Sequence, residues 1–343
     1  MKKTVSLGLC LFLAFAAASV FAGGRGEGPR EGEWNPTRPV QLIVPWGAGG
    51  STDLVSRIVV PELERALRAR IIVSNQPGAS GATGTQATLD AARDGYTWTA
   101  GSVGGLGLYQ VNNLLDTNMK EDWHLFLTAA DVGVIGVNPN SPYQTFADLL
   151  AAFRANPGQV RVATAGLTSS GTINIEKIRQ FTGIEFTNVP YGGGGPAVTA
   201  VVSGEVMVTS QLISEQIDLI RGGAIRPLVA LRMTDLYVSG FGTIPSITRY
   251  VPEFTTGENW FGIFIPKGVP DVVISTMQRV WTEVIANSDE VRTFVEGRGF
   301  RFDPSSGDLA HERAFEWYQP VGWLFYDNQL APVRPDTVGI PRP

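Results

Sequence analysis

Short apolar segments and helical patterns alternate along most of this chain, separated by turns rich in glycine and proline. Val40–Val44 is the first strand-like segment, and apolar residues then recur three and four positions apart from Leu54 to Leu67, which predicts a helix with one apolar face. From Phe146 the same order of strand, turn and helix begins again. Such alternation is typical of α/β proteins with mainly parallel sheets. We therefore expect an α/β fold with two sheets and about two domains.

Four turns between a strand and a helix combine small residues with hydroxyl side chains. They are Trp46–Asp53, Gly78–Gly84, Gly166–Thr172 and Tyr191–Pro196. Ligands of open parallel sheets bind beyond the carboxyl ends of the strands. A helix that begins there offers unpaired N–H groups and the positive end of its dipole, and glycine lets a ligand approach the backbone. The turns predict a site that binds an anion without lysine or arginine.

Each turn taken alone also has a purely structural interpretation. Serine, threonine and aspartate are ordinary helix caps, and glycine before a helix is ordinary loop chemistry. Asp53 either caps the first helix or accepts a bond from a ligand, and we favour the cap. Trp46 either forms an apolar wall beside the ligand or packs against Pro45. The recurrence of such turns in one chain favours a ligand site.

The motifs of nucleotide-binding proteins and of common enzymes are missing from the sequence. The segment GAGGSTD has neither the GxGxxG spacing nor the Gly-Lys-Ser/Thr ending of a P-loop, and neither GxSxG nor HExxH occurs. His124 and His311 are the only histidines, in contexts that suggest structural roles. We expect no catalytic residues, no metal site and no cofactor. A pair of carboxylates that meets only in the folded chain stays open as an alternative.

The N-terminus has the order of features of a secretory signal. Lys2 and Lys3 precede an apolar run from Leu7 to Ala18, and Val20–Ala22 is a small-residue processing site, so we expect a signal peptide at 1–22 and a flexible lead-in at 23–37. The run is shorter than the roughly 20 apolar residues of a membrane span, and an uncleaved anchor is the alternative. This predicts a periplasmic, extracytoplasmic protein.

Removal of the signal peptide changes both the cysteine content and the charge of the chain. Cys10, the only cysteine, lies within it, so the mature chain would have no disulfide and no thiolate ligand. Without Lys2 and Lys3, 25 basic residues stand against 32 acidic ones, a net charge of about −7. An acidic chain with scattered lysine and arginine is a poor nucleic-acid binder.

Four segments carry a resemblance to a known family. They are PVQLIVPWGAGGSTDLVSR, VSNQPGASGATGTQATLDAARDGYTW, VATAGLTSSGTINIEKIRQFTGIEFTNVPYGGGGPAVTAVVSGEV and WFGIFIPKGVP. In this order and spacing the chain resembles the Bug-type solute receptors of tripartite tricarboxylate transporters, from about Pro39 to Phe325. The resemblance implies a two-domain, type II Venus-flytrap periplasmic-binding-protein fold with a ligand cleft between the domains. Residues 38–136 and 258–343 would form a discontinuous first domain and 137–257 the second, with crossings near Val134–Asn138 and Trp260–Ile265.

The resemblance also implies a small carboxylate ligand, held by backbone amides, hydroxyls and ordered water in the first and third turns. The candidate ligand-binding residues are Trp46, Gly47, Ala48, Gly49, Gly50, Ser51, Thr52 and Asp53 in the first turn, Ala79 and Ser80 in the second, Thr168, Ser169, Ser170, Gly171 and Thr172 in the third, and Tyr191 in the fourth. Gln76, Asn174 and Gly192 stand where family members often carry arginine, histidine and lysine. A ligand with a single carboxylate is therefore as well supported as citrate.

The function implied by the resemblance is capture of the carboxylate and its delivery to membrane permease subunits, by a receptor that we expect to be a monomer. A sensing subunit of the same fold, which docks on a signalling receptor, is the alternative. An enzyme such as a hydrolase is a third possibility, for which the sequence offers no nucleophile and base in a recognisable arrangement.

Overall fold

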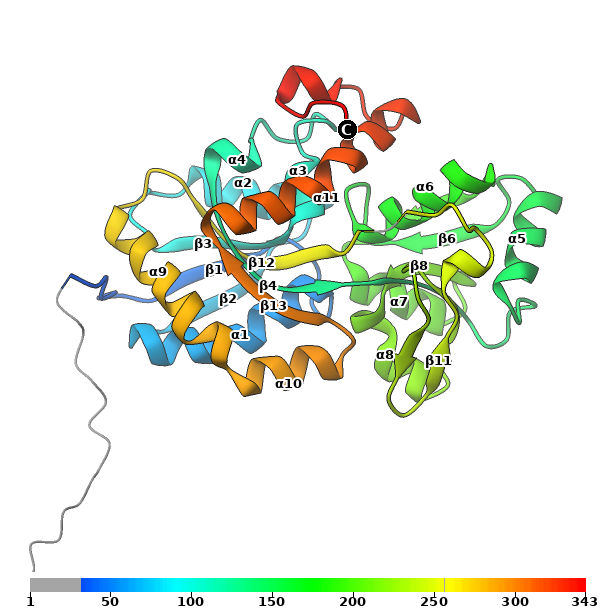
Figure 1. Ribbon diagram of the computed structural model, residues 1–343, viewed down its shortest axis with the longest axis horizontal. Coiled ribbons are helices and arrows are strands. Elements are labelled where there is room, and N and C mark those ends of the chain that lie inside the picture. The colour runs from blue at the N-terminus through cyan, green and yellow to red at the C-terminus, as the bar shows by residue number, and fades with distance from the viewer. Residues whose placement is uncertain (1–31, 256) are drawn as a thin grey trace, which may run out of the picture. The chain divides into compact units, whose positions relative to one another are not determined.

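Two mixed β-sheets and the helices packed on them make up the computed structural model (Figure 1). The structure describes residues 32–255 and 257–343. The expected signal peptide at 1–22, and all of the lead-in before residue 32, lie outside the described residues. Within the described part of the chain, no helix has both the length and the apolar character needed to span a membrane.

The larger sheet has six strands in the order β13-β4-β12-β3-β1-β2. Their bounds are β1 Val40–Val44, β2 Ile71–Asn75, β3 Thr97–Ser102, β4 Trp123–Asp131, β12 Asn259–Pro266 and β13 Arg301–Ser306. Strand β1 pairs in parallel with β2 and β3, whereas β12 is antiparallel to both β3 and β4, and β13 is antiparallel to β4.

The smaller sheet has five strands in the order β7-β6-β8-β5-β9. Their bounds are β5 Gly133–Val137, β6 Arg161–Thr164, β7 Thr187–Pro190, β8 Val208–Leu212 and β9 Arg226–Ala230. Strand β6 is parallel to β7 and β8, but β5 is antiparallel to β8 and β9. The expectation of mainly parallel sheets is therefore wrong. Most of the antiparallel pairs involve β5 and β12, which follow crossings between the sheets and run against the strands beside them, and β13 also runs against β4.

Helices cover both sheets. The longer ones are α1 Ser51–Leu67, α2 Ala82–Asp90, α9 Asp271–Glu283, α10 Asp289–Gly297 and α11 Gly307–Asp327 around the larger sheet, and α5 Phe146–Ala155, α6 Ser170–Thr182, α7 Gly194–Val202 and α8 Ile213–Arg221 around the smaller one. Shorter elements are α3 Val103–Gly107, α4 Met119–Asp122, η1 Ala79–Gly81, η2 Ile247–Arg249, η3 Ile285–Asn287, η4 Pro335–Val338 and the hairpin of β10 Leu236–Val238 and β11 Gly242–Ile244.

Helix α1 illustrates how the sequence pattern becomes packing. Val55, Val59 and Leu63 recur every four residues, and all are buried in the cluster that α1 shares with α9, α10 and the larger sheet. The helix is one continuous element through Pro61. Its N-terminus lies directly after the first turn, so burial of its apolar face against the sheet also fixes the position of that turn.

The chain passes from one sheet to the other over a single residue. Strand β4 ends at Asp131 in the larger sheet and β5 begins at Gly133 in the smaller one, with Val132 between them. This lies slightly before the crossing expected near Val134–Asn138. The chain returns to the larger sheet with β12 at Asn259. The division into two domains at residues 136–137 and 257–258 stays a prediction.

Candidate functional site

The first and fourth turns touch each other across the two sheets. The Gly47 N–H donates to the Gly192 carbonyl over 2.8 Å. A Cβ on Gly193 would lie 2.7 Å from the Gly47 nitrogen, which is closer than real Cβ atoms come. Glycine at these positions therefore permits a backbone-to-backbone contact between elements that belong to different sheets.

The second and third turns also meet directly. The Ser80 Oγ accepts the Leu167 N–H at 2.9 Å, and the Thr168 Oγ1 donates to the Ser80 carbonyl at 3.0 Å. Ser80 has a φ of +54° and lies in the left-handed region, which costs a non-glycine residue free energy. The four turns singled out in the sequence thus form two pairs, each bridging the sheets.

A small cavity of about 30 Å³ lies between the first and third turns. Six predicted residues line it: Trp46, Gly50, Ser51, Thr52, Ser169 and Ser170. Ser102 and Phe261 of the larger sheet also line it. The remaining lining residues belong to the smaller half, by which we mean the smaller sheet and the helices around it: Ala165, Gly194, Gln211, Leu212 and Glu215. The volume suits ordered water and is far below the roughly 300 Å³ of a pocket for a drug-sized ligand.

The remaining predicted residues support the turns without lining this cavity. Burial raises the pKa of Asp53, but bonds from the Arg57 side chain, the Gly49 N–H and the Asn75 amide outweigh burial and hold the pKa below its usual value. The capping interpretation of Asp53 is wrong, because the N-cap of α1 is Gly50 and Asp53 instead holds the preceding turn through the Gly49 N–H. Ala48 is exposed on the outer part of the turn, and Ala79 precedes Ser80 in η1.

In the third and fourth turns the supporting residues bond within the smaller half. The Thr172 Oγ1 donates to the Gly166 carbonyl at 2.7 Å, and Gly171 packs so closely on β8 that a Cβ there would lie 2.0 Å from the Ser210 carbonyl oxygen. The Tyr191 hydroxyl donates to Glu205 at 2.8 Å. Tyr191 is therefore engaged with Glu205 and is not among the residues that line the cavity.

Trp46 lies between the cavity and the second turn. Its side chain is almost fully buried, at 7% exposure, and lines the cavity. It also packs on Gly81, where a Cβ would come within 3.0 Å of the indole ring. Removal of the ring would thus disturb the second turn as well as the wall of the cavity.

Glu215, which the sequence analysis did not single out, has its carboxylate at the N-terminus of α1. Its Oε1 accepts the Ser51 N–H at 2.9 Å and lies 3.1 Å from the Ser51 Oγ, and its Oε2 accepts the Leu212 N–H at 3.3 Å. With the Gln211 amide oriented so that its oxygen accepts the Ala165 N–H, the Gln211 nitrogen donates to Oε2 at 2.8 Å. Burial raises the pKa of Glu215, and the bonds from Ser51 and Leu212 offset part of that rise.

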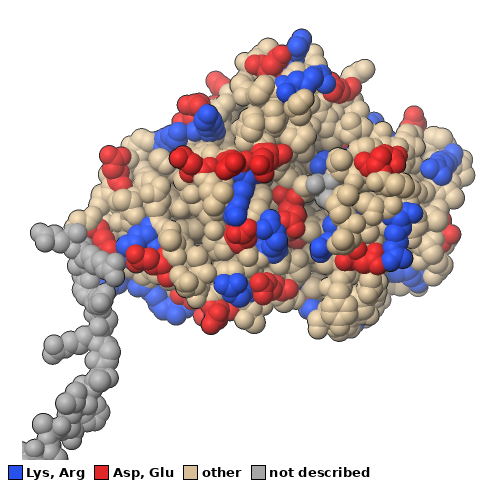
Figure 2. Space-filling model, in the orientation of Figure 1, with Lys and Arg blue, Asp and Glu red and all other residues tan. Residues whose placement is uncertain are grey.

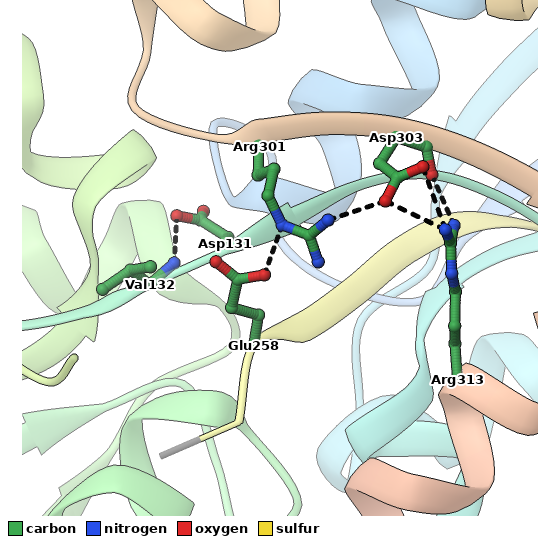
Figure 3. A network of polar contacts seen from close by, with 6 residues as sticks. All are labelled: Asp131, Val132, Glu258, Arg301, Asp303 and Arg313. Atoms are coloured by element: carbon green, nitrogen blue, oxygen red, sulfur yellow. Dashed lines mark hydrogen bonds and ion pairs between the residues drawn. The ribbon is translucent and has the colours of Figure 1, made fainter. Parts of the chain in front are cut away.

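Asp131, also not foreseen, lies where the chain crosses between the sheets, and its Oδ1 accepts the Val132 N–H at 2.8 Å (Figure 3). Its Oδ2 lies 2.5 Å from the Ser214 Oγ and 3.1 Å from the Ser51 Oγ. Burial, with the negative charge of Glu215 adding to it, raises the pKa of Asp131 to about 7. Ser51 therefore connects two carboxyl groups.

The arginines near this crossing are already paired. Arg301 donates to Glu258 and to Asp303 at 2.6 Å, and Arg313 donates to both oxygens of Asp303 (Figure 3). No lysine, arginine or histidine is among the described residues that line the cavity. The positive groups that face the cavity are therefore the N–H groups at the helix N-termini.

The position of Glu215 in the sequence is a signal that could have identified it. Glu215 lies just after the carboxyl end of β8 and in the first turn of a helix, as the predicted site residues do after β1 and β6. Strand β8 ends at Leu212 and α8 begins at Ile213, so no glycine-rich turn separates them, and glycine was the feature by which the other turns were selected.

Comparison with known proteins shows which protein family has a sequence like this one. The family model described as "Tripartite tricarboxylate transporter family receptor" matches residues 55–311, well over half of the chain. The chain belongs to this family. The protein BugT of Bordetella pertussis is 30% identical to it over 292 residues, which are 81% of this chain and 86% of BugT. The protein is therefore a solute-binding receptor of the Bug type.

Solved structures agree on the fold of this receptor. The periplasmic binding protein BugD superposes with a TM-score of 0.79 at 19% identity, over 86% of this chain and 99% of BugD. Rpa4515 of R. palustris, in a structure with adipate, has a TM-score of 0.77 at 24% identity, over 87% of this chain and 99% of that one. The receptor thus has the α/β periplasmic-binding-protein fold, with two sheets, that the family resemblance implied.

Proposed function

We propose that this receptor captures a small carboxylate between its two sheets in the periplasm and delivers it to the membrane permease subunits of a tripartite tricarboxylate-type transporter. It would be exported by residues 1–22 and act as a monomer. Family membership supports the transporter, and the adipate in the structure with Rpa4515 supports the chemical class of the ligand.

The observation that carries this proposal is the convergence of helix N-termini on a cavity without basic side chains. Helix α1 begins at Ser51, α6 at Ser170 and α7 at Gly194, and all three residues line the cavity. The first N–H groups of a helix have no acceptor within the helix, and the dipole favours an anion there. A hydrogen bond to a charged acceptor contributes about 1.5–3 kcal/mol.

Ligand entry requires the two sheets to separate, because 30 Å³ does not hold a carboxylic acid of several carbons. The bonds that must open include Gly47–Gly192, Ser80–Leu167 and Ser51–Glu215. Each contributes about 0.5–1.5 kcal/mol net, or up to about 3 kcal/mol with the charged Glu215. A ligand then favours reclosure only by as much as it binds the closed state better than the open one.

Charge on the outer surface is mixed on the face shown in Figure 2, where acidic and basic side chains lie interspersed. That face offers no broad positive field to attract an anion over a distance. Recognition would therefore depend on the donors inside the cleft.

The test is a thermal-shift screen of mono-, di- and tricarboxylates, combined with mass spectrometry of small molecules that copurify. A ligand at 100 times its Kd stabilises the folded state by about 2.7 kcal/mol, which raises Tm measurably. We expect at least one carboxylate to raise Tm in proportion to the logarithm of its concentration. A saturating panel without any shift would contradict the proposed ligand class.

A further inference from the structure

The carboxylate of Glu215 bonds the backbone N–H of Ser51, a residue predicted to bind the ligand, at the start of α1. It also bonds the backbone N–H of Leu212 just before α8. It also lies against Gly194 at the start of α7, where a Cβ would be only 2.0 Å from its Oε1. Three helix N-termini therefore already face an anion that belongs to the protein itself.

The bonding pattern favours the ionised form of Glu215. The backbone N–H groups of Ser51 and Leu212 and the Gln211 amide all donate to it. Of the partners named here, only the Ser51 hydroxyl, 3.1 Å from Oε1, could accept a hydrogen from a protonated carboxyl, whereas the three N–H donors all suit a carboxylate. Glu215 thus brings a negative charge into the cavity that it lines.

A second ligand carboxylate at this end of the cavity would meet that charge. It would compete with Glu215 for the Ser51 N–H and would lie close to Asp131, whose Oδ2 is 3.1 Å from the Ser51 Oγ. The described residues that line the cavity include no cation to offset the repulsion. Two like charges a few ångströms apart in a partly dry site repel strongly.

The α6 end of the cavity differs in charge from the end at Glu215, because the residues that line it at the start of α6 carry hydroxyl groups and no carboxylate. Ser169 and Ser170 line the cavity there, and Ser169 caps the helix through the Thr172 N–H at 3.3 Å. The first turn of α6 can still receive one carboxylate. The cavity is therefore electrostatically asymmetric, with an anion-binding side and an acidic side.

We propose that Glu215 determines ligand specificity: it selects a monocarboxylate whose second polar group is a hydrogen-bond donor, above all an ammonium group, and it selects against dicarboxylates. This inference rests on the proposed function as a carboxylate receptor. It adds a named residue and a narrower ligand class. An ammonium group would bond Glu215 where a second carboxylate would be repelled.

The test compares matched pairs of ligands by titration calorimetry on the full-length protein. Each pair consists of an amino monocarboxylate and a dicarboxylate of equal chain length, such as 4-aminobutanoate and succinate, at lengths of three to six carbons. We expect the amino monocarboxylate of the best-bound pair to bind at least tenfold more tightly. Glu215→Gln, which keeps shape and removes charge, should reduce that ratio at least tenfold.

Asp218→Asn is the matched control, because it removes the same charge from the same helix α8. Asp218 is exposed and pairs with Arg221 and Arg298 at the surface. We expect this variant to keep the wild-type ratio. An unchanged ratio in Glu215→Gln, or a similar loss in Asp218→Asn, would overturn the role of Glu215.

The wild-type series decides the question even if Glu215→Gln fails to fold. Tighter binding of dicarboxylates than of amino monocarboxylates by the wild-type protein overturns this inference and leaves the carboxylate receptor intact. A complete lack of binding by every carboxylate, in this series and in the thermal-shift screen, overturns the proposed function and this inference with it.

Discussion

Asp131 and Glu215 place two carboxyl groups beside one serine hydroxyl. The Ser51 Oγ lies 3.1 Å from an oxygen of each acid and 2.8 Å from the Ser214 Oγ, but it has only one hydrogen to donate. Burial raises the pKa of Asp131 to about 7 and moves that of Glu215 in the same direction. The charge state at the crossing between the sheets should therefore change near neutral pH.

We predict that Asp131→Asn changes how stability depends on pH. Because the pKa of Asp131 rises from 3.8 to about 7 on folding, the folded state holds a proton that the unfolded chain has lost between these values. The stabilisation that the protonated Asp131 carboxyl adds to the free energy of unfolding is present below pH 4 and disappears as pH rises through 7. The Tm of the variant relative to wild type should thus be higher at pH 8 than at pH 5, by about 2 °C or more.

Asp53→Asn is a control in which the pH dependence of stability should change in the opposite direction. Bonds from Arg57, Gly49 and Asn75 hold the pKa of Asp53 below its usual value, so its contribution is present at neutral pH and lost in acid. The Tm of Asp53→Asn should fall further below that of wild type at pH 6 than at pH 3. Melting curves of Asp131→Asn that stay parallel to wild type at all pH values would contradict the role given to Asp131.

At the scale of elements, the N-terminus of α7 approaches the cleft only because it carries glycines. A Cβ on Gly194 would lie 2.0 Å from Glu215, and one on Gly195 would lie 2.6 Å from the Ala48 carbonyl oxygen. The Gly194 contact lies within the smaller half, because α8 carries Glu215, whereas the Gly195 contact joins the two halves. Gly193, whose Cβ would lie 2.7 Å from the Gly47 nitrogen, and Gly195 therefore set how closely the two halves approach.

Gly194→Ala should lower the free energy of unfolding by about 1–3 kcal/mol, the usual cost of overpacking a filled interior, as measured by urea denaturation. Gly297→Ala, at the end of α10, is the matched control, because a Cβ there has no neighbour within 4 Å. That substitution should leave the free energy of unfolding within about 0.5 kcal/mol or raise it through better helix propensity. Equal effects of the two variants would argue against the close contact at Gly194.

The elements themselves were largely readable from the sequence. The period of Val55, Val59 and Leu63 predicts α1, and its placement after β1 is confirmed. The strand directions were not readable, because β5 and β12 run antiparallel to their neighbours after crossings that depend on the tertiary fold. Glu215 was missed for a similar reason, since only the folded chain brings α8 to the N-terminus of α1.

At the scale of the whole molecule, contacts between the two halves hold the described arrangement closed. Backbone bonds join the first and fourth turns, and Ser80 joins the second turn to the third. Near the crossing, Ser51 of α1 and Ser214 of α8 face each other with their hydroxyl oxygens 2.8 Å apart. Under the proposed function, a ligand would enter after such contacts separate.

A disulfide between these two serine positions should restrict that separation, because it adds a second covalent link beside the crossing at Val132. The hydroxyl separation is close to what a disulfide with an S–S length of about 2.05 Å needs after a small adjustment. Oxidised Ser51→Cys/Ser214→Cys should show a smaller ligand-induced rise in Tm than the reduced form. The two single variants, measured in parallel, report what each substitution does alone. Equal rises in the oxidised and reduced double variant would show that entry needs no separation here.

Because Val132 alone joins β4 to β5, the connection has no slack. The two halves can tilt about this point but cannot slide apart along it. Atoms beside the pivot then travel least, and atoms at the far rim sweep the longest arc. A slight change in the angle between the halves beside Asp131 would therefore produce a much larger displacement at the far rim.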